Sequence, residues 1–140
     1  MIRALPFLLF AAPALAEGNL AAKVAGQYGS VDDPAFSCAE NPVDLQFTDR
    51  PPHGNFTWDT ARKIHDDSLA QQAVYDLLGE TRLGLLMRLA GETRRTDSGA
   101  PVVWVLRPDA DFGGFCWGRA DWPLVRCISP FRRCNLAPTS

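Results

Sequence analysis

Alternating apolar and polar residues are the clearest pattern in the middle of the chain. Val43, Leu45 and Phe47 alternate with polar residues, and Phe56 and Trp58 repeat the alternation a few positions later. A period of two turns one face of a strand toward a core and the other toward solvent. The pattern therefore predicts two half-buried β-strands.

The leucine-rich segment that follows has two interpretations. Every second residue from Leu83 to Leu89 is apolar, which predicts a strand. The wider segment Leu77–Ala90 could instead form an amphipathic helix, although Gly79 and Gly84 would weaken it. We favour the strand because the alternation is strict.

Other short apolar runs complete an all-β pattern. Strands are predicted at 26–29, 74–78, 102–106, 115–118 and 124–128. The polar segment 62–68 is read as a loop, with a short helix over Asp66–Ala73 as an option. About eight strands, with a turn signal roughly every 8–12 residues, are the pattern of an antiparallel barrel or sandwich, and we favour a single antiparallel β-barrel. Such a barrel has room inside for side chains or one small ligand.

The first sixteen residues have the features of a secretory signal peptide. A positive start is followed by the apolar run Leu5–Leu15 and an Ala14-Leu15-Ala16 cleavage signature. The run is shorter than the roughly 20 residues of a membrane-spanning helix, so no membrane span is expected. We therefore expect a signal peptide over 1–16 and one domain over 17–140. The domain should be periplasmic or secreted. We expect no lipid anchor, because the residue after the expected cleavage site is Glu17 and not cysteine.

The opening of that domain resembles a known family. Gly26-Gln27-Tyr28 is similar to the Gly-x-Trp that opens lipocalins, and the export signal and strand count are similar to those of small periplasmic inhibitor barrels. The resemblance covers three residues, with Tyr28 in place of tryptophan, and no second lipocalin motif follows. It implies a lipocalin-like barrel and no particular ligand class.

Four cysteines in an exported chain predict two disulfides. A hairpin with its loop at 120–123 would place Cys116 directly across from Cys127, close to disulfide range. Cys38 would then pair with Cys134. The alternative, Cys38–Cys116 with Cys127–Cys134, stays open on sequence grounds.

Charge and motifs give little support for other functions. The formal net charge is −2, which does not suit a nucleic-acid-binding protein. No C-x-x-C, H-E-x-x-H or G-x-S-x-G motif occurs, and His53 and His65 fall in predicted loops. Asp109 and Asp111 resemble the start of a calcium loop that lacks its remaining ligands. We therefore expect a monomer with no catalytic residues, metal or cofactor.

Aromatic residues supply the first set of candidate binding residues. In the barrel mouth they could line a cavity for a small apolar ligand, although core packing is the alternative, above all for the tryptophan of the apolar run 102–106. The candidates are the aromatic residues Trp58, Tyr75, Trp104 and Trp117, together with the apolar residue Met87.

The last hairpin supplies the second set. Trp122 lies near its tip, with Arg119 and Arg126 beside it, and an exposed tryptophan there could anchor an exported protein partner. Trp122 could equally fold back over the barrel end, with the arginines in solvent. The leading hypothesis is an exported, non-catalytic barrel that binds a small apolar ligand or a protein. The alternatives are a structural or accessory envelope protein without ligand, and a hydrolase.

Overall fold

The computed structural model describes residues 19–64 and 67–135, and about half of these residues belong to one β-sheet. The expected signal peptide, His65 and Asp66 lie outside the described residues. No helix within these ranges is long and apolar enough to cross a bilayer. The elements are α2 (Asn19–Val24), β1 (Gly26–Ser30), the 3₁₀ helix η2 (Pro34–Phe36), β2 (Val43–Asp49), β3 (Pro52–Lys63), β4 (Leu69–Glu80), β5 (Leu85–Leu89), β6 (Trp104–Pro108), β7 (Gly114–Arg119) and β8 (Ile128–Arg133).

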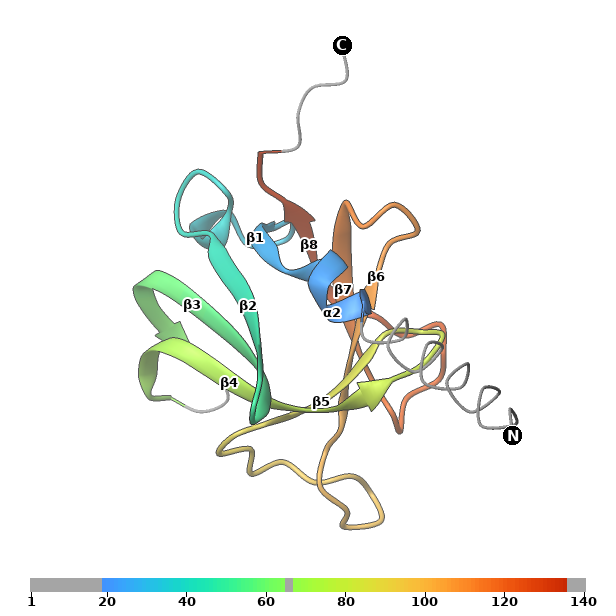
Figure 1. Ribbon diagram of the computed structural model, residues 1–140. Coiled ribbons are helices and arrows are strands. Elements are labelled where there is room, and N and C mark those ends of the chain that lie inside the picture. The colour runs from blue at the N-terminus through green and yellow to red at the C-terminus, as the bar shows by residue number, and fades with distance from the viewer. Residues whose placement is uncertain (1–18, 65–66, 136–140) are drawn as a thin grey trace, which may run out of the picture.

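The eight strands close into a barrel (Figure 1). Each strand pairs antiparallel with the next, and β8 pairs with β1. The predicted all-β fold, a single antiparallel barrel of about eight strands, is confirmed. Because consecutive strands alternate in direction, the β1–β2, β3–β4, β5–β6 and β7–β8 loops share one end of the barrel, here called the open end. The other end, which α2 approaches, is called the closed end.

The core follows the alternation seen in the sequence. In β2, Val43 and Leu45 are buried while the residues between them are exposed. In β5, Leu85, Met87 and Leu89 are buried, so the strand interpretation of this segment is confirmed and the helix is excluded. The inward faces of the strands therefore supply one continuous hydrophobic core.

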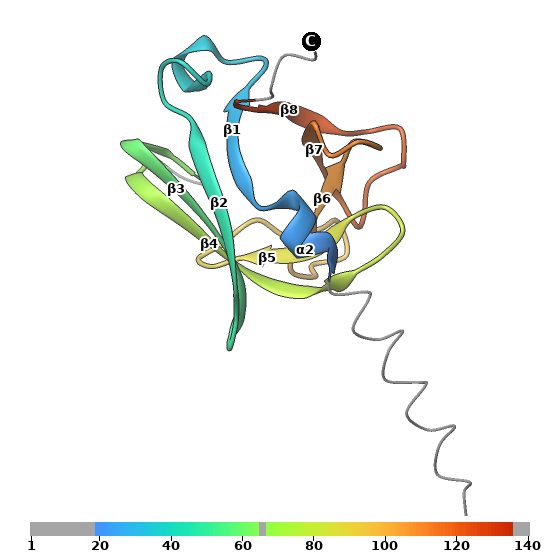
Figure 2. The ribbon, with the colours of Figure 1, turned by 45° about the horizontal axis from the view of Figure 1, so that its top comes forward.

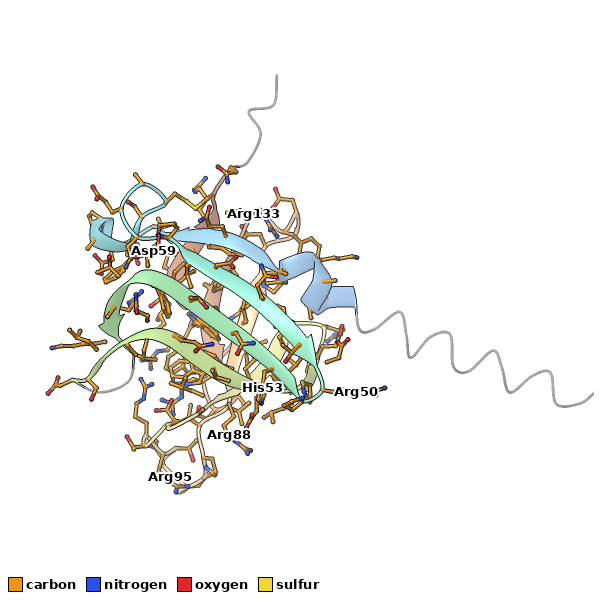
Figure 3. The ribbon with its side chains drawn as sticks, turned by 60° about the vertical axis from the view of Figure 1, so that its left-hand side comes forward. Arg50, His53, Asp59, Arg88, Arg95 and Arg133 are labelled. Atoms are coloured by element: carbon orange, nitrogen blue, oxygen red, sulfur yellow. A yellow bond between two sulfur atoms is a disulfide. The ribbon has the colours of Figure 1, made fainter. Side chains whose placement is uncertain are left out.

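α2 lies across the closed end (Figure 2). Val24 of this helix is fully buried, and its carbonyl accepts a 2.6 Å hydrogen bond from the Tyr28 hydroxyl. Arg133, labelled in Figure 3, has its guanidinium carbon 4.9 Å from the Tyr28 ring centre. Its N–H groups donate to three backbone carbonyls, those of Lys23 (2.8 Å), Ala25 (2.9 Å) and Phe112 (2.9 Å). The helix and Arg133 together tie the closed end to both terminal strands.

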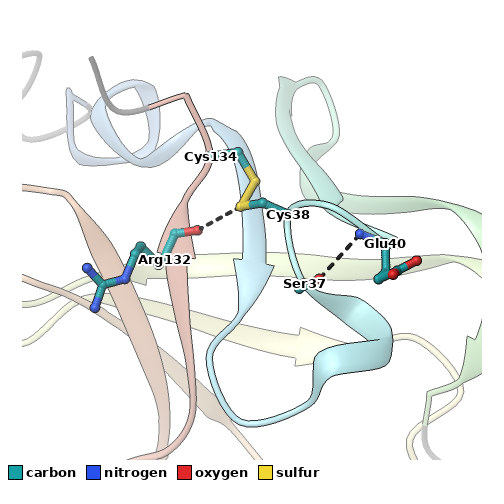
Figure 4. The surroundings of a disulfide bond; sticks show 5 residues. All are labelled: Ser37, Cys38, Glu40, Arg132 and Cys134. Carbon is teal, nitrogen blue, oxygen red and sulfur yellow. Dashed lines mark hydrogen bonds between the residues drawn. A yellow bond between two sulfur atoms is a disulfide. The ribbon is translucent and has the colours of Figure 1, made fainter. Parts of the chain in front are cut away.

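The long-range disulfide joins Cys38 of the β1–β2 loop to Cys134, just after β8 (Figure 4). The bridge spans 96 positions of sequence, and Cys38 Sγ also lies 3.8 Å from the carbonyl oxygen of Arg132. This confirms the preferred pairing. The bridge fixes a loop that contributes few apolar residues of its own to the core.

The second predicted disulfide, Cys116–Cys127, is also present. The hairpin around it differs from the prediction, because the last strand begins at Ile128 and not at position 124. Trp117 pairs with Ile128, and a register shift follows along β8. Cys116 is therefore diagonal to Cys127 and not directly opposite, and the connecting loop, 120–127, is longer than expected.

The segment between Phe56 and Leu78 is also more strand-rich than predicted. The helix over Asp66–Ala73 is wrong, because β4 runs from Leu69 to Glu80, and β3 extends into the expected loop as far as Lys63. The two strands pair along most of their length. This long ladder satisfies the backbone hydrogen-bonding groups and outweighs the weak local preference of the glutamines and alanines for a helix.

Candidate ligand-binding site

A pocket of about 200 Å³ lies inside the open end of the barrel. Its floor and walls come from inward-facing residues of β3, β4, β6, β7 and β8, and its rim from the loops. The lining residues are Phe56, Trp58, Arg62, Lys63, Ile64, Ala73, Tyr75, Arg94, Trp104, Trp117, Ile128, Ser129 and Phe131. The structure thus brings together four of the five aromatic and apolar residues predicted to line a cavity.

The fifth, Met87, lies elsewhere. It is fully buried in β5, and it does not line the pocket. A Cβ added at Gly54 would lie 2.6 Å from Met87 Cε, which shows how tightly that part of the interior is filled. The interior around Met87 is therefore filled by side chains, while the aromatic pocket lies at the open end.

Aromatic rings hold the pocket walls in place. Tyr75 stacks on Trp117 with ring centres 5.2 Å apart, and Phe56 packs edge-on against Tyr75 at 5.1 Å. Trp104 meets Trp117 edge-on at 6.1 Å. Each ring is braced by at least one other, so the pocket is formed before any ligand binds.

Trp58 leaves a hydrogen-bond donor unused. Its side chain lines the pocket and is only 7% exposed, yet its Nε1 has no hydrogen-bond partner among the described residues. A buried, unpaired N–H destabilises a fold by about 1–3 kcal/mol. Native proteins rarely retain such a group without a reason, such as an acceptor supplied from outside the chain.

Tyr75 is a second donor in the pocket. Burial raises the pKa of its hydroxyl well above the ordinary value, Glu92 raises it further, and Arg94 and Arg62 only partly oppose these effects. Tyr75 is therefore neutral at physiological pH. Its hydroxyl makes no hydrogen bond within the described residues, so it remains free to donate one.

An ion pair forms part of the rim. Arg94 of the β5–β6 loop donates to both carboxylate oxygens of Glu92, at 2.6 and 2.9 Å, and Trp104 Nε1 donates to the same carboxylate at 2.8 Å. The Glu92 side chain is 5% exposed. Burial alone would raise its pKa, but the hydrogen bonds from Arg94 and Trp104 outweigh burial and lower it. This ion pair fixes the Trp104 indole at the mouth.

Arg62 also lines the pocket, and two aromatic rings hold its guanidinium group. Its guanidinium carbon lies 4.0 Å from the Phe36 ring centre and 5.1 Å from that of Trp58. Burial lowers the pKa of Arg62, with a smaller opposing effect from Asp33 and then Tyr75. The side chain is half-buried and has no ion pair among the described residues.

Local structure explains why Arg62 reaches the pocket. The β3–β4 register shifts between Thr57 and Arg62, which leaves a bulge in β3. The buried side chain of Asn41 holds this bulge, since its Nδ2 donates to the Thr60 carbonyl at 2.9 Å and its Oδ1 accepts from the Thr60 N–H at 3.1 Å. Phe36 sits in the β1–β2 loop that the long-range disulfide secures.

The predicted partner-binding residues pack around Trp122, which lies against Trp104 and does not project as an exposed tip. Trp122 is half-buried and packs edge-on against Trp104 at 5.8 Å. Arg126 lies 3.9 Å and Arg119 5.1 Å from the Trp122 ring centre, and Arg119 also donates to both oxygens of Asp121. The exposed apolar residues are the next ones along the loop: Leu124, Val125 and Ile128.

Outside the pocket, His53 forms a pair with a carboxylate. His53 Nε2 lies 3.1 Å from Asp76 Oδ1 across the β3–β4 pair, with both side chains partly exposed, and Figure 3 places His53 beside Arg50 at the β2–β3 turn. Neither side chain makes a further hydrogen bond within the described residues. The described part of the chain contains no group of three potential metal ligands.

Sequence reasoning missed the polar half of the site. Arg62 fell in a presumed loop, and Glu92, Arg94 and Asn41 carried no pattern that linked them to a pocket. The available signal was weak: an arginine four positions after an apolar–polar alternation that ends at Trp58.

The fold and this site define a closed, eight-stranded antiparallel barrel with a preformed aromatic pocket at one end. Comparison of the chain with protein-family models, with curated proteins and with solved structures found no match. The function must therefore be argued from the pocket itself.

Proposed function

We propose that this protein is an exported, non-catalytic binding protein that holds a small ligand in the open-end pocket. The observation that carries the proposal is the preformed aromatic pocket at the open end, walled by the rings of Phe56, Trp58, Tyr75 and Trp117. A solid structural barrel would gain stability by filling this space. Two disulfides suit an oxidising compartment, which supports export to the periplasm or beyond.

The volume limits the size of the ligand. Pockets for drug-sized ligands measure roughly 300–1,000 Å³, and this one measures about 200 Å³. An apolar cavity of about 150 Å³ accepts benzene. The part of the ligand that the pocket holds is therefore one ring or of similar bulk. The lipocalin-like interpretation stays a prediction and adds no ligand class.

A second candidate function, binding of an exported protein, is favoured by the β7–β8 loop. Val125 is 94% exposed, and Leu124 and Ile128 are exposed beside it. The disulfide at Cys127 and a 2.8 Å hydrogen bond from Arg107 to the Leu124 carbonyl hold the loop in shape. An apolar, preformed loop is a suitable anchor for a protein partner.

Native mass spectrometry of the protein purified from the organism that makes it tests the proposal. We expect a retained small molecule. Ala73→Leu should lower its retention about tenfold or more, because Ala73 is buried in the pocket lining and overpacking is unfavourable by roughly 1–3 kcal/mol. Ala100→Leu, in an exposed loop, is the control. A protein that copurifies at a fixed ratio would favour the second candidate, and retention that Ala73→Leu leaves unchanged would refute the pocket.

A further inference from the structure

The pocket lining carries positive charge without negative charge. Arg62, Lys63 and Arg94 all line it, and no acidic side chain of the described residues does. Two of these cations are compensated nearby: both carboxylate oxygens of Glu92 accept from Arg94, and Lys63 Nζ lies 3.6 Å from Asp67 Oδ1. Arg62 is the exception.

Arg62 is held between two rings and has no ion pair among residues 19–64 and 67–135. Its contacts with Phe36 and Trp58 are contacts of the guanidinium with ring faces, which restrict the plane of the group without occupying its N–H donors. Asp33 raises the pKa of Arg62 by less than burial lowers it, and the Asp33 carboxylate caps η2 by accepting from the Ala35 N–H at 3.1 Å. A half-buried cation that lacks a close ion pair is stabilised further when an anion joins it.

The uncharged hydroxyl groups of the lining, those of Tyr75 and Ser129, can also donate hydrogen bonds. Trp58 provides an aromatic face beside Arg62, whose guanidinium carbon is 5.1 Å from the Trp58 ring centre, while the buried Trp58 Nε1 is not exposed to the pocket. Tyr75 provides a neutral hydroxyl, and its stacking on Trp117 creates a flat apolar wall. Donors around the mouth and flat rings within match a ligand that accepts hydrogen bonds at one end and is planar at the other.

We propose that the ligand of this pocket is a ring-sized organic anion whose carboxylate binds the Arg62 guanidinium while its ring packs among Trp58, Tyr75 and Trp117. The inference rests on the proposed function and narrows it from a small apolar ligand to a small anionic one. Arg62 is the residue that determines specificity for charge. The aromatic wall determines specificity for shape.

A matched set of probes tests the inference on the full mature chain. Benzoate, benzamide and benzylamine share a ring and differ in charge, and isothermal titration calorimetry at pH 7 measures their affinities, with tryptophan fluorescence as a second readout. We expect benzoate to bind about tenfold or more tightly than benzamide. The reason is that only the benzoate carboxylate can form a charge-assisted, bidentate hydrogen-bonded pair with the Arg62 guanidinium. Benzylamine should bind weakest.

Variants then assign the preference to Arg62. Arg62→Gln should abolish the advantage of benzoate over benzamide and leave benzamide affinity within about twofold. Arg62→Lys keeps the charge without the planar fork and should retain part of the advantage. Arg82→Gln removes the same charge from the exposed β4–β5 turn at the closed end and should change nothing. Far-UV circular dichroism checks that each variant is folded.

The outcomes separate the two proposals. If benzamide binds as tightly as benzoate, or if Arg62→Gln keeps the preference, the anion inference is overturned while the pocket remains a binding site. If none of the three probes binds to the folded wild-type chain, the ring-sized binding function fails, and the anion inference fails with it.

Discussion

Replacing Cys38 and Cys134 together by alanine should lower the free energy of unfolding by about 5 kcal/mol. The bridge spans 96 positions, and in the chain-entropy model a loop of that length restricts the unfolded chain by about this amount. The Cys116–Cys127 bridge spans only 11 positions, so its removal should lower the free energy by about 3 kcal/mol. The two double variants should therefore differ by about 2 kcal/mol.

Guanidinium chloride unfolding, followed by tryptophan fluorescence, measures both values under the same conditions. Comparison of the two double variants with each other matters more than either absolute value, because both introduce alanines and both leave one bridge intact. Adding a reductant to each variant should bring the two to the same stability. If the short bridge contributes as much as the long one, or more, the argument from loop length is refuted.

Two further predictions follow from the contacts of single residues. In urea titrations, Gly84→Ala should lower the free energy of unfolding by about 1–3 kcal/mol more than Gly79→Ala. The backbone angle φ is nearly the same at the two sites, +158° at Gly84 and +159° at Gly79. However, a methyl group at Gly84 would overlap the Leu106 carbonyl, whereas one at Gly79 would meet no atom within 4 Å. Equal losses would show that backbone conformation alone decides. Folding lowers the pKa of Glu92, so its ion pair stabilises the fold above the ordinary value of 4.5, and this stabilisation is lost as the pH falls through the folded-state value. Glu92→Gln should therefore destabilise the protein at pH 7 and much less at pH 3, and a gap that does not change with pH would contradict this.

The strands were predictable where burial on one side imposed a period. Val43 and Leu45, and Met87 between its leucines, occupy the inward positions that alternation required. The prediction failed for the segment around Gln71 and Gln72, where consecutive polar residues are both exposed and show no apolar–polar alternation. There the partner strand supplies the structure, and a local pattern cannot reveal a partner.

The candidate site was predictable only in its aromatic half. Trp58 and Tyr75 were recognisable because large rings in strands near a barrel mouth commonly face inward. Trp122 was left with two possible positions, and its packing against Trp104 decided between them. Arg62 could not be assigned, because a bulge with a shifted register places it at the pocket.

The sequence alone determined the strand period and the all-β class, and it favoured a barrel. These depend on the order of side chains along the chain, which burial of one face imposes directly. The sequence also favoured the cysteine pairing Cys38–Cys134 with Cys116–Cys127, but it did not exclude the alternative pairing. The tertiary structure decided the cysteine pairing, the closure of β8 onto β1, the pocket at the open end and the place of Arg62 in its lining. These depend on register and on contacts between residues far apart in the chain, such as Phe36 with Arg62, which no local pattern encodes.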